Sequence, residues 1–195
     1  VDPHQSGTVT LRGKQVKIRT PRDAIANGFG FSTENRKTEG LILSFSILRN
    51  ISLPSESGLC CRTFCIDSGR ERSFSEKLAE KLGVKAQSLD LPAGALSGGN
   101  QQKVVIAKWV GMKPSVLILD EPTRGIDVGA KRDIYDLMNE LTAKGVSIIM
   151  VSSELPEVIG MSDRVMVVHE GRIAGILDRK EATQERIMTM ATGGQ

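Results

Sequence analysis

Two groups of residues in this 195-residue chain have types and spacing suited to chemistry, and the first is the turn Ser97-Gly98-Gly99. The turn stands directly before a segment with helical apolar spacing, so Ser97 is predicted to cap a helix there. The two glycines would leave the first backbone N–H groups of that helix unobstructed. A helix N-terminus carries partial positive charge and unpaired donors, so a phosphate is its natural ligand. The plain alternative is a capped helix preceded by an ordinary turn.

The second group is the adjacent pair of carboxylates Asp120 and Glu121, which follows the apolar run at 116–119. Such a run predicts a buried parallel strand, and open α/β sheets bind their ligands at the carboxyl ends of these strands. Asp120 is suited to hold Mg²⁺, usually through water. Glu121 could polarise an attacking water as a general base, a role that contributes roughly 10²- to 10⁴-fold. The alternative is that two acids simply begin a loop.

The elements that must position these groups are clearest in the last third of the chain. Two apolar runs flank a segment in which the apolar residues have helical spacing, which predicts strand, helix and strand with a right-handed crossover. Because these runs are apolar at every position except Ser147, both strands are expected to be buried on both faces. Two further strands joined by a Glu-Gly turn and a final helix complete an α/β arrangement. The predicted strands are 116–119, 146–151, 164–169 and 172–177, and the predicted helices carry Ile134, Leu137, Met138 and Leu141, or follow Thr183.

The earlier part of the chain divides into a strand-rich and a helical zone. Short β-rich runs at 8–11, 15–18 and 29–33 predict strands. Between 41 and 112 the pattern is mostly helical, with an irregular stretch at 53–75 and a helix at 75–82. The last helix of the zone buries Val105, Trp109 and Met112, which share a face, while Lys103 and Lys108 are expected on a solvated face.

Composition narrows the class of protein. With 39% hydrophobic residues and a net charge of +3, the chain is expected to fold, and its scattered lysines and arginines do not indicate a nucleic-acid surface. The odd set Cys60, Cys61 and Cys65 favours reduced thiols over disulfides. No apolar stretch approaches the roughly 20 residues that cross a bilayer.

Several motifs, taken together, resemble one family. The segment 96–103 is similar to the signature of the ABC ATPases, Asp120-Glu121 to their Walker B motif, Gly125-Ile126-Asp127 to their D-loop, and 28–34 to the strand that enters their Q-loop. The variants found here are most similar to the second half of the tandem ATPases that energise ribose, galactoside and xylose import. The resemblance implies a P-loop NTPase-like α/β fold with a mostly parallel core sheet, a small antiparallel part and a helical subdomain. It also implies one partial nucleotide-binding domain over 1–195, with the helical subdomain at 41–112 and core α/β structure at 113–195.

The resemblance further implies ligands, partners and residue roles. ATP and Mg²⁺ are the expected ligands, with Mg²⁺ at Asp120, and the ATP is held by another ATPase half with an intact Walker A segment. Membrane-spanning permease subunits, and indirectly a sugar-binding protein, are the expected partners at the cytoplasmic face of the membrane, where the chain would be peripheral. Glu121 would be a weak or vestigial base, and Ser153 occupies the position of the switch histidine. The residues expected near the nucleotide are Ser97, Gly98, Gly99, Asn100, Gln101, Glu34 and Asp127.

One departure from the family matters most. The chain contains no Gly-x-x-x-x-Gly-Lys-[Ser/Thr] sequence, so the isolated chain is expected to be inactive as an ATPase. Two alternatives stay open: a non-catalytic scaffold or regulatory domain that docks on a membrane subunit, and an ABC ATPase of DNA repair or translation. The charge pattern gives the last of these no support.

Overall fold

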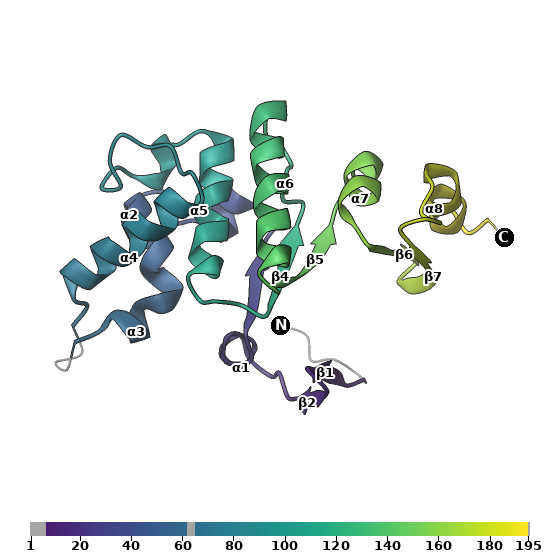
Figure 1. The fold of residues 1–195 in the computed structure, drawn as a ribbon, viewed down its shortest axis with the longest axis horizontal. Coiled ribbons are helices and arrows are strands. Elements are labelled where there is room, and N and C mark those ends of the chain that lie inside the picture. Colours follow the sequence, from purple (N-terminus) through teal and green to yellow (C-terminus); the bar gives the residue numbers. More distant parts are fainter. Residues whose placement is uncertain (1–6, 62–64, 195) are drawn as a thin grey trace. The chain divides into compact units, whose positions relative to one another are not determined.

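The computed structural model describes residues 7–61 and 65–194, which form two compact units divided between Ile149 and Met150 (Figure 1). Each unit is described by itself. Within the first, a three-stranded sheet has the order β3 (Phe29–Ser32), β4 (Val116–Asp120), β5 (Ser147–Val151), and β5 continues across the boundary. A separate antiparallel hairpin is formed by β1 (Val9–Leu11) and β2 (Lys14–Val16).

Strands β3 and β4 are parallel, as expected for an α/β fold, and Phe29 is paired with Val116. Leu117 and Leu119 of β4 are fully buried, because this strand lies in the middle of its sheet. The prediction for β5 was wrong in one respect: Ile149 and Val151 are each 52% exposed, so one face of this strand is open. The apolar run identified the strand but did not establish that both of its faces are covered.

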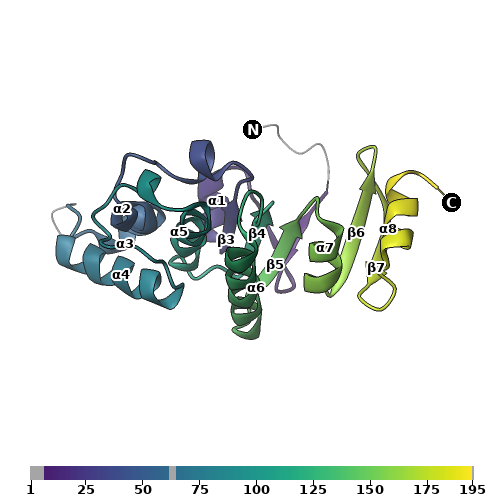
Figure 2. The same ribbon diagram turned by 90° about the horizontal axis from the view of Figure 1, so that it is seen from above.

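Helices of the first unit pack around α5 (Gly98–Val110), which carries most of the signature-like segment 96–103. Helix α5 contacts α2, α4, α6 and β3, and so lies between the helical zone and the sheet (Figures 1 and 2). Their bounds are α1 (Pro21–Ala26), the π-helical turn η1 (Arg36–Gly40), α2 (Ile47–Ser52), η2 (Leu53–Ser55), α3 (Glu56–Leu59), α4 (Ser68–Lys81), η3 (Ala93–Ala95), α5 (Gly98–Val110) and α6 (Val128–Ala143).

Helix α6 confirms the pattern that predicted it. Its four apolar residues with helical spacing are all buried, and the chain leaves it through Gly145 with a φ of 85°, a conformation that favours glycine. The buried residues are Ile134, Leu137, Met138 and Leu141.

Four helices differ from expectation. Helix α3 lies in the stretch predicted to be irregular, and α7 (Leu155–Met161) was not predicted. Helix α1 was not predicted, although Thr20 and Asp23 form a capping box around Pro21, a strong start signal. Helix α4 begins at Ser68, seven residues before the predicted start at Ser75, because the Asp67 carboxylate accepts from the N–H groups of Gly69 and Arg70. Its mostly polar first turns hid it from a reading based on apolar spacing.

The loop that leads into α5 is fixed to the start of α2 by backbone hydrogen bonds. The first two N–H groups of α2, those of Ile47 and Leu48, donate to the carbonyls of Leu91 and Leu89, at 2.9 Å each. The third, that of Arg49, donates to Ser46 Oγ at 3.1 Å. The orphan donors of a helix N-terminus thus hold a distant loop in place.

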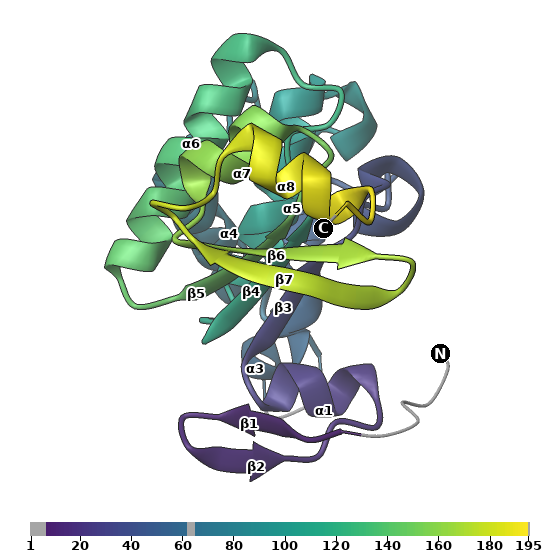
Figure 3. The ribbon, with the colours of Figure 1, turned by 90° about the vertical axis from the view of Figure 1, so that its right-hand side faces the viewer.

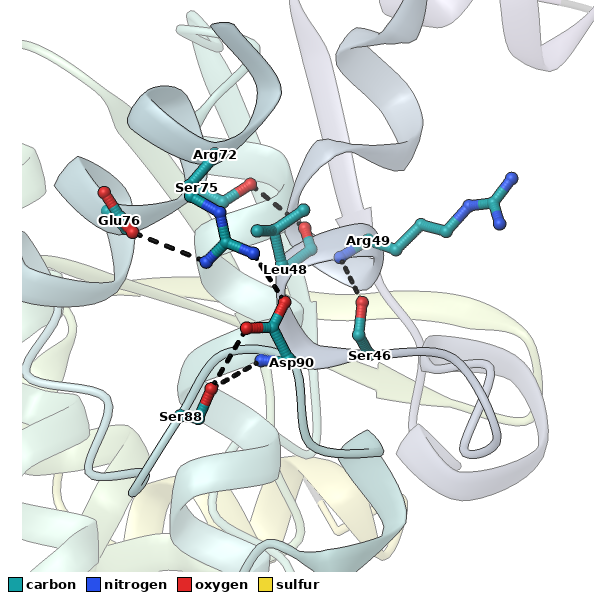
Figure 4. Close-up of polar contacts among 8 residues, drawn as sticks. All are labelled: Ser46, Leu48, Arg49, Arg72, Ser75, Glu76, Ser88 and Asp90. Carbon is teal, nitrogen blue, oxygen red and sulfur yellow. Dashed lines mark hydrogen bonds and ion pairs between the residues drawn. The ribbon is translucent and has the colours of Figure 1, made fainter. Parts of the chain in front are cut away.

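Side chains add a second attachment between the same loop and α4 (Figure 4). Arg72 Nη2 lies 2.7 Å from Asp90 Oδ1, and the bond lowers the pKa of Asp90 below its usual value. Ser88 Oγ accepts from the N–H of Asp90 at 3.1 Å, and Ser75 Oγ donates to the carbonyl of Leu48 at 3.0 Å. The approach to α5 is therefore held from two helices.

Asn50 holds the other side of this junction. Its side chain is buried; Oδ1 accepts from the N–H of Ile42 at 2.9 Å, and Nδ2 donates to the carbonyls of Ile42 and Ser46 at 3.0 Å each. A further carbonyl, that of Phe45, lies 3.3 Å from Nδ2. One buried amide therefore satisfies most of a tight loop.

The second unit is a β-hairpin with helices on one face. Strands β6 (Arg164–His169) and β7 (Arg172–Asp178) are antiparallel with a bulge near Val167, and α8 (Gln184–Ala191) packs on them (Figure 3). Helix α7 is Leu155–Met161, and its apolar residues join the same core. The strands and the final helix confirm the predicted order. The core residues are Val165, Val167, Leu177, Ala182 and Ile187.

No helix within residues 7–61 and 65–194 is long and apolar enough to cross a membrane.

Candidate functional site at the start of α5

Helix α5 has nine buried residues among its 13. Val104, Val105, Ile106 and Ala107 are fully buried, and Trp109 is half-buried as a packing residue. Such a helix keeps its N-terminus at a fixed place relative to the sheet. Whatever binds at its first turn therefore meets a rigid element rather than a loop.

Ser97 occupies the N-cap position, but its hydroxyl does not accept a hydrogen bond from the helix backbone, so the predicted side-chain cap is wrong. Asn100 Nδ2 instead donates to Ser97 Oγ at 3.0 Å, and Asn100 Oδ1 accepts from the N–H of Lys85 at 2.7 Å. Among the described residues, no acceptor takes the N–H groups of Gly98 and Gly99. The N-terminus of α5, called its mouth below, therefore has backbone N–H groups without an acceptor in its first turn.

Packing within the chain constrains both glycines, Gly99 strictly and Gly98 only through the movable end of the Arg36 side chain. A Cβ on Gly99 would lie 2.5 Å from Ala130 Cβ of α6, a distance that real atoms do not show. A Cβ on Gly98 would lie 2.8 Å from the guanidinium of Arg36. Besides the expected exposure of N–H groups, these glycines allow close contact between segments.

The side chain of Gln101 points into the protein, toward the turn that precedes α5. It is 3% exposed, and its Nε2 donates to the carbonyl of Ala93 at 3.3 Å, while its Oε1 has no partner among the described residues. Its observed contact supports the turn that precedes α5.

Beside the mouth of α5 lies a hollow of about 370 Å³. It brings together residues that the sequence separates by up to about fifty positions, and it joins the signature-like segment to the start of α6. Asp127, Ser97 and Asn100 of the predicted site are among its lining residues, whereas Asp120 and Glu121 are not. The full lining is Lys85, Ser97, Gly99, Asn100, Lys103, Asp127, Gly129, Ala130 and Asp133.

Asp127 has a clear local role at this hollow. It is the N-cap of α6, and its Oδ1 accepts from the N–H of Ala130 at 3.0 Å. A carboxylate at this end of a helix is also favoured by the helix dipole. The segment 125–127, which resembles a D-loop, therefore ends at the capped N-terminus of α6.

The carboxylate pair lies where the parallel strand predicts it, at the carboxyl end of β4. Asp120 is the last residue of the strand and is half-buried. Glu121 has a φ of 46°, a left-handed conformation that costs a non-glycine residue about 1 kcal/mol or more. Pro122 and Thr123, both buried, hold the chain in place after this turn. Asp120 and Glu121 thus differ in backbone conformation although they are neighbours.

Glu34 pairs with an arginine that the sequence had not singled out. Its carboxylate forms an ion pair with Arg124, and the side chains are 49% and 64% exposed, respectively. Two residues later, Arg36 Nη1 donates to the carbonyl of Arg124 at 2.7 Å and Nη2 to that of Gly125 at 3.3 Å. A second hollow of about 290 Å³ lies here, lined by Glu34, Asn35, Arg36, Lys37 and Arg124.

Two lysines of α5 were expected on a solvated face, and this was wrong. Lys103 is 6% exposed, and its Nζ donates to Asp133 Oδ2 at 2.8 Å and to the carbonyl of Gly83 at 3.1 Å. Lys108 Nζ donates to the carbonyl of Gly40 at 2.5 Å, and burial lowers its pKa. Both ammonium groups find partners from segments far away in the sequence.

Ser153 lies in the second unit. It is exposed, just before α7. The neighbouring Ser152 donates a short hydrogen bond to the buried Glu157 and accepts from the N–H of Glu154 at 3.1 Å. The segment that carries Ser153 is therefore fixed on one side by a buried carboxylate. Within the part of the chain that the structure describes, no cluster of three histidine, cysteine or acidic residues could hold a metal ion by itself.

Comparison with known proteins agrees with this arrangement. The family model described as "ABC transporter" matches residues 1–124. The chain is 57% identical to "Ribose import ATP-binding protein RbsA" of Bacillus licheniformis and 61% identical to the protein so named in Lacticaseibacillus paracasei. Each match covers 100% of this chain but 39% of the relative, so the chain spans about two fifths of those proteins.

Solved structures agree at the level of the fold. A nucleotide-free ATP-binding cassette from an ABC transporter has a TM-score of 0.76 at 20% identity, over 96% of this chain and 74% of that chain. The cassette MJ1267 gives 0.77 at 21% identity, over 95% of this chain and 77% of its own.

Proposed function

The chain belongs to the ABC transporter family, and on that premise we propose that it is the ATP-binding subunit, in its C-terminal half, of an importer for a monosaccharide such as ribose. Family membership implies binding of ATP and dependence on Mg²⁺ in general. The ribose importers named above are similar over the whole of this chain. The protein would act at the cytoplasmic face of the membrane with permease subunits and, indirectly, a sugar-binding protein. It would bind no nucleic acid.

The observation that carries the proposal is the presence of backbone N–H groups without an acceptor in the first turn of α5. The N–H groups of Gly98 and Gly99 have no acceptor among the described residues, and Ser97 is exposed beside them. Ser97 and Gly99 border a hollow, whereas Gly98 faces the guanidinium of Arg36. Backbone donors at a helix N-terminus are suited to the oxygens of a phosphate, to which hydrogen bonds are worth about 1.5 to 3 kcal/mol each.

The proposed ATP site is completed in trans. This chain has no Gly-x-x-x-x-Gly-Lys-[Ser/Thr] sequence, so its own residues offer no lysine and Gly-rich loop to hold a triphosphate. Ser97, Gly98 and Gly99 would donate to the γ-phosphate of ATP carried by a partner ATPase half, with Asn100 supporting Ser97. The phosphate contacts would then favour a closed assembly that hydrolysis releases. On its own the chain would be inactive as an ATPase.

The carboxylates of this chain have a smaller role in the proposal. Asp120 would hold Mg²⁺ through water, and its half-buried carboxylate at the end of β4 fits an ion that prefers oxygen ligands. When bound, Mg²⁺ neutralises charge on the phosphates. Glu121 would be a weak or vestigial base, since no phosphate-binding loop of this chain anchors a nucleotide beside it. Ser153, in the place of the switch histidine, has no cationic form at neutral pH.

A scaffold without an ATP site is the second candidate. It is favoured by two contacts that involve predicted nucleotide ligands: Glu34 pairs with Arg124, and the guanidinium of Arg36 lies against Gly98. A scaffold of this kind would dock on a membrane subunit without changing the rate of hydrolysis by its partner.

The test measures ATP hydrolysis by the partner half alone and with this chain added. Stimulation by the unmodified chain is expected, and Ser97→Arg should abolish it by filling the mouth of α5. Ser57→Arg is the matched control, because Ser57 is exposed on α3, far away in the sequence from the proposed site. Near-normal turnover with Ser97→Arg would contradict the trans site. Docking of the unmodified chain without any change in rate would favour the scaffold.

A further inference from the structure

The π-helical turn η1 is held at both ends by segments that flank the candidate site. At its start, Arg36 donates to two successive carbonyls, those of Arg124 and Gly125. At its end, the carbonyl of Gly40 accepts from Lys108 of α5. Isolated π-helical turns are rare and are found frequently at functional sites. This turn therefore connects the loop before α6 to the signature-like helix.

Arg36 contacts two parts of the site at once. Its Nη1 lies 2.7 Å from the carbonyl of Arg124, while its Nη2 lies 2.8 Å from the position that a Cβ of Gly98 would take. The same planar group therefore lies between the loop after β4 and the mouth of α5. A displacement of this side chain would change the spacing between the two.

The geometry depends on the shape of the guanidinium as well as on its charge. Two nitrogens of one rigid fork reach two neighbouring carbonyls, which a single ammonium group cannot reproduce. The nearby carboxylate of Glu34 pairs with Arg124. The Nε of Arg36 is buried and has no partner among the described residues, so the observed bonds are all made by its outer nitrogens.

We propose that Arg36 is a positioning residue that fixes the Arg124–Gly125 segment against the mouth of α5. It would thereby keep the phosphate-facing donors of Gly98 and Gly99 in register with the start of α6 at Asp127. The attachment of the Arg124–Gly125 segment by the Arg36 guanidinium, called the tie below, is a property of this chain. Only its effect on ATP hydrolysis rests on the proposed function.

The first arm of the test measures the tie in the chain alone. Arg36→Lys keeps the positive charge and removes the fork, whereas Lys37→Gln removes one charge from the same turn and leaves the fork intact. Amide hydrogen exchange is followed at Arg124 and Ile126, whose N–H groups donate to the carbonyls of Glu121 and Thr123. The amide of Ile134, fully buried in the middle of α6, is the reference for global opening.

Arg36→Lys is expected to raise exchange at Arg124 and Ile126 at least tenfold relative to Ile134, and Lys37→Gln to change it less than twofold. Equal exchange in the unmodified chain and in Arg36→Lys would overturn the proposal. Should Arg36→Lys fail to fold, rotation of the Arg36 guanidinium is measured by NMR in the unmodified chain. Hindered rotation supports the tie, and free rotation overturns it.

The second arm uses the assembled pair of this chain and its ATPase partner. Arg36→Lys should lower kcat at least fivefold and change KM for ATP less than twofold, because the site is misaligned while the nucleotide is still held by the partner. Lys37→Gln should stay near normal. A normal kcat for Arg36→Lys overturns the functional part. Absence of stimulation by the unmodified chain would count against the proposed function, while the exchange arm would still decide the tie.

Discussion

Lys103 of α5 lies 2.8 Å from Asp133 of α6, and the same ammonium group donates to the carbonyl of Gly83 at the end of α4. Helices α5 and α6 and the turn after α4 therefore meet at this group. The Lys103 side chain is 8% exposed, whereas that of Asp133 is 49% exposed. The contact lies at the edge of the hollow beside Ser97. It stabilises the packing on which the first turn of α5 depends.

Removal of this nitrogen is expected to destabilise the fold. Lys103→Met keeps the length of the side chain but loses both hydrogen bonds, and the free energy of unfolding should fall by about 1 to 3 kcal/mol. Lys144→Met is the control: it breaks a surface pair with Glu140, both side chains being more than half exposed, so about 0.5 kcal/mol or less is expected. Urea denaturation measures both, and equal losses would contradict the role of Lys103.

The same pair predicts a pH dependence. The bond from Lys103 lowers the pKa of Asp133 from its usual 3.8. A lowered folded-state pKa means that the contribution is fully present above the unfolded-state value and is lost as the pH falls through the folded-state value. The difference in unfolding free energy between the unmodified chain and Asp133→Asn should therefore shrink between pH 7 and pH 3. A difference that grows on acidification would contradict this sign.

A methyl group at Gly99 should disturb the contact between α5 and α6. Because its carbon would lie 2.5 Å from Ala130 Cβ, Gly99→Ala should cost about 1 to 3 kcal/mol of unfolding free energy. Gly129→Ala is the control, since its Cβ would meet nothing closer than 3.4 Å. Adding Ala130→Gly should recover part of the loss, and no recovery would show that the clash lies elsewhere. Thermal or urea denaturation of the four proteins checks this.

Asn50 is expected to be the most sensitive polar residue of the helical zone. Asn50→Ala removes the partners of the Ile42 N–H and carbonyl groups in a buried setting, so a loss of about 3 kcal/mol is expected. Asn139→Ala, on the exposed side of α6, should stay within about 0.5 kcal/mol. Circular dichroism during urea titration distinguishes the two, and a small effect at Asn50 would mean that water replaces its bonds.

Glu121 provides a prediction about catalysis in the assembled pair. A general base contributes roughly 10²- to 10⁴-fold, so a weak or vestigial base predicts that Glu121→Gln lowers the stimulated hydrolysis less than about tenfold. The rate is measured at saturating ATP with the partner half unmodified. A loss of a hundredfold or more would identify Glu121 as a working base and refute the vestigial role.

Local patterns in the sequence predicted those elements whose signals are local. The four apolar residues of α6, the parallel strand before Asp120 and the turn at Glu170-Gly171 depend on periodicity and turn chemistry within a few residues, and all are present. The early start of α4 was missed because its first turns are polar, although Asp67 is a good cap. Apolar spacing is thus a better guide to buried faces than to helix ends.

The site could be predicted only in part for a physical reason. Ser97 and Asp127 were identified from motifs, but the partners of Arg36, Lys103 and Lys108 include backbone carbonyls between 20 and 89 positions away. Every residue offers a carbonyl, so no pattern of side-chain types marks such an acceptor. Arginine or lysine at these positions therefore looks like an ordinary surface charge until the fold is known.

The amide of Asn100 has one orientation, because its oxygen is taken by the N–H of Lys85 and its nitrogen must then face Ser97. Ser97 therefore receives a hydrogen through its oxygen and keeps its own hydrogen for an incoming acceptor. An aspartate at position 100 would reverse this polarity, since the serine hydrogen would turn to the new carboxylate and an oxygen lone pair would face outward. The choice between nitrogen and oxygen at a single terminal atom thus decides whether this loop attracts an anion or repels it.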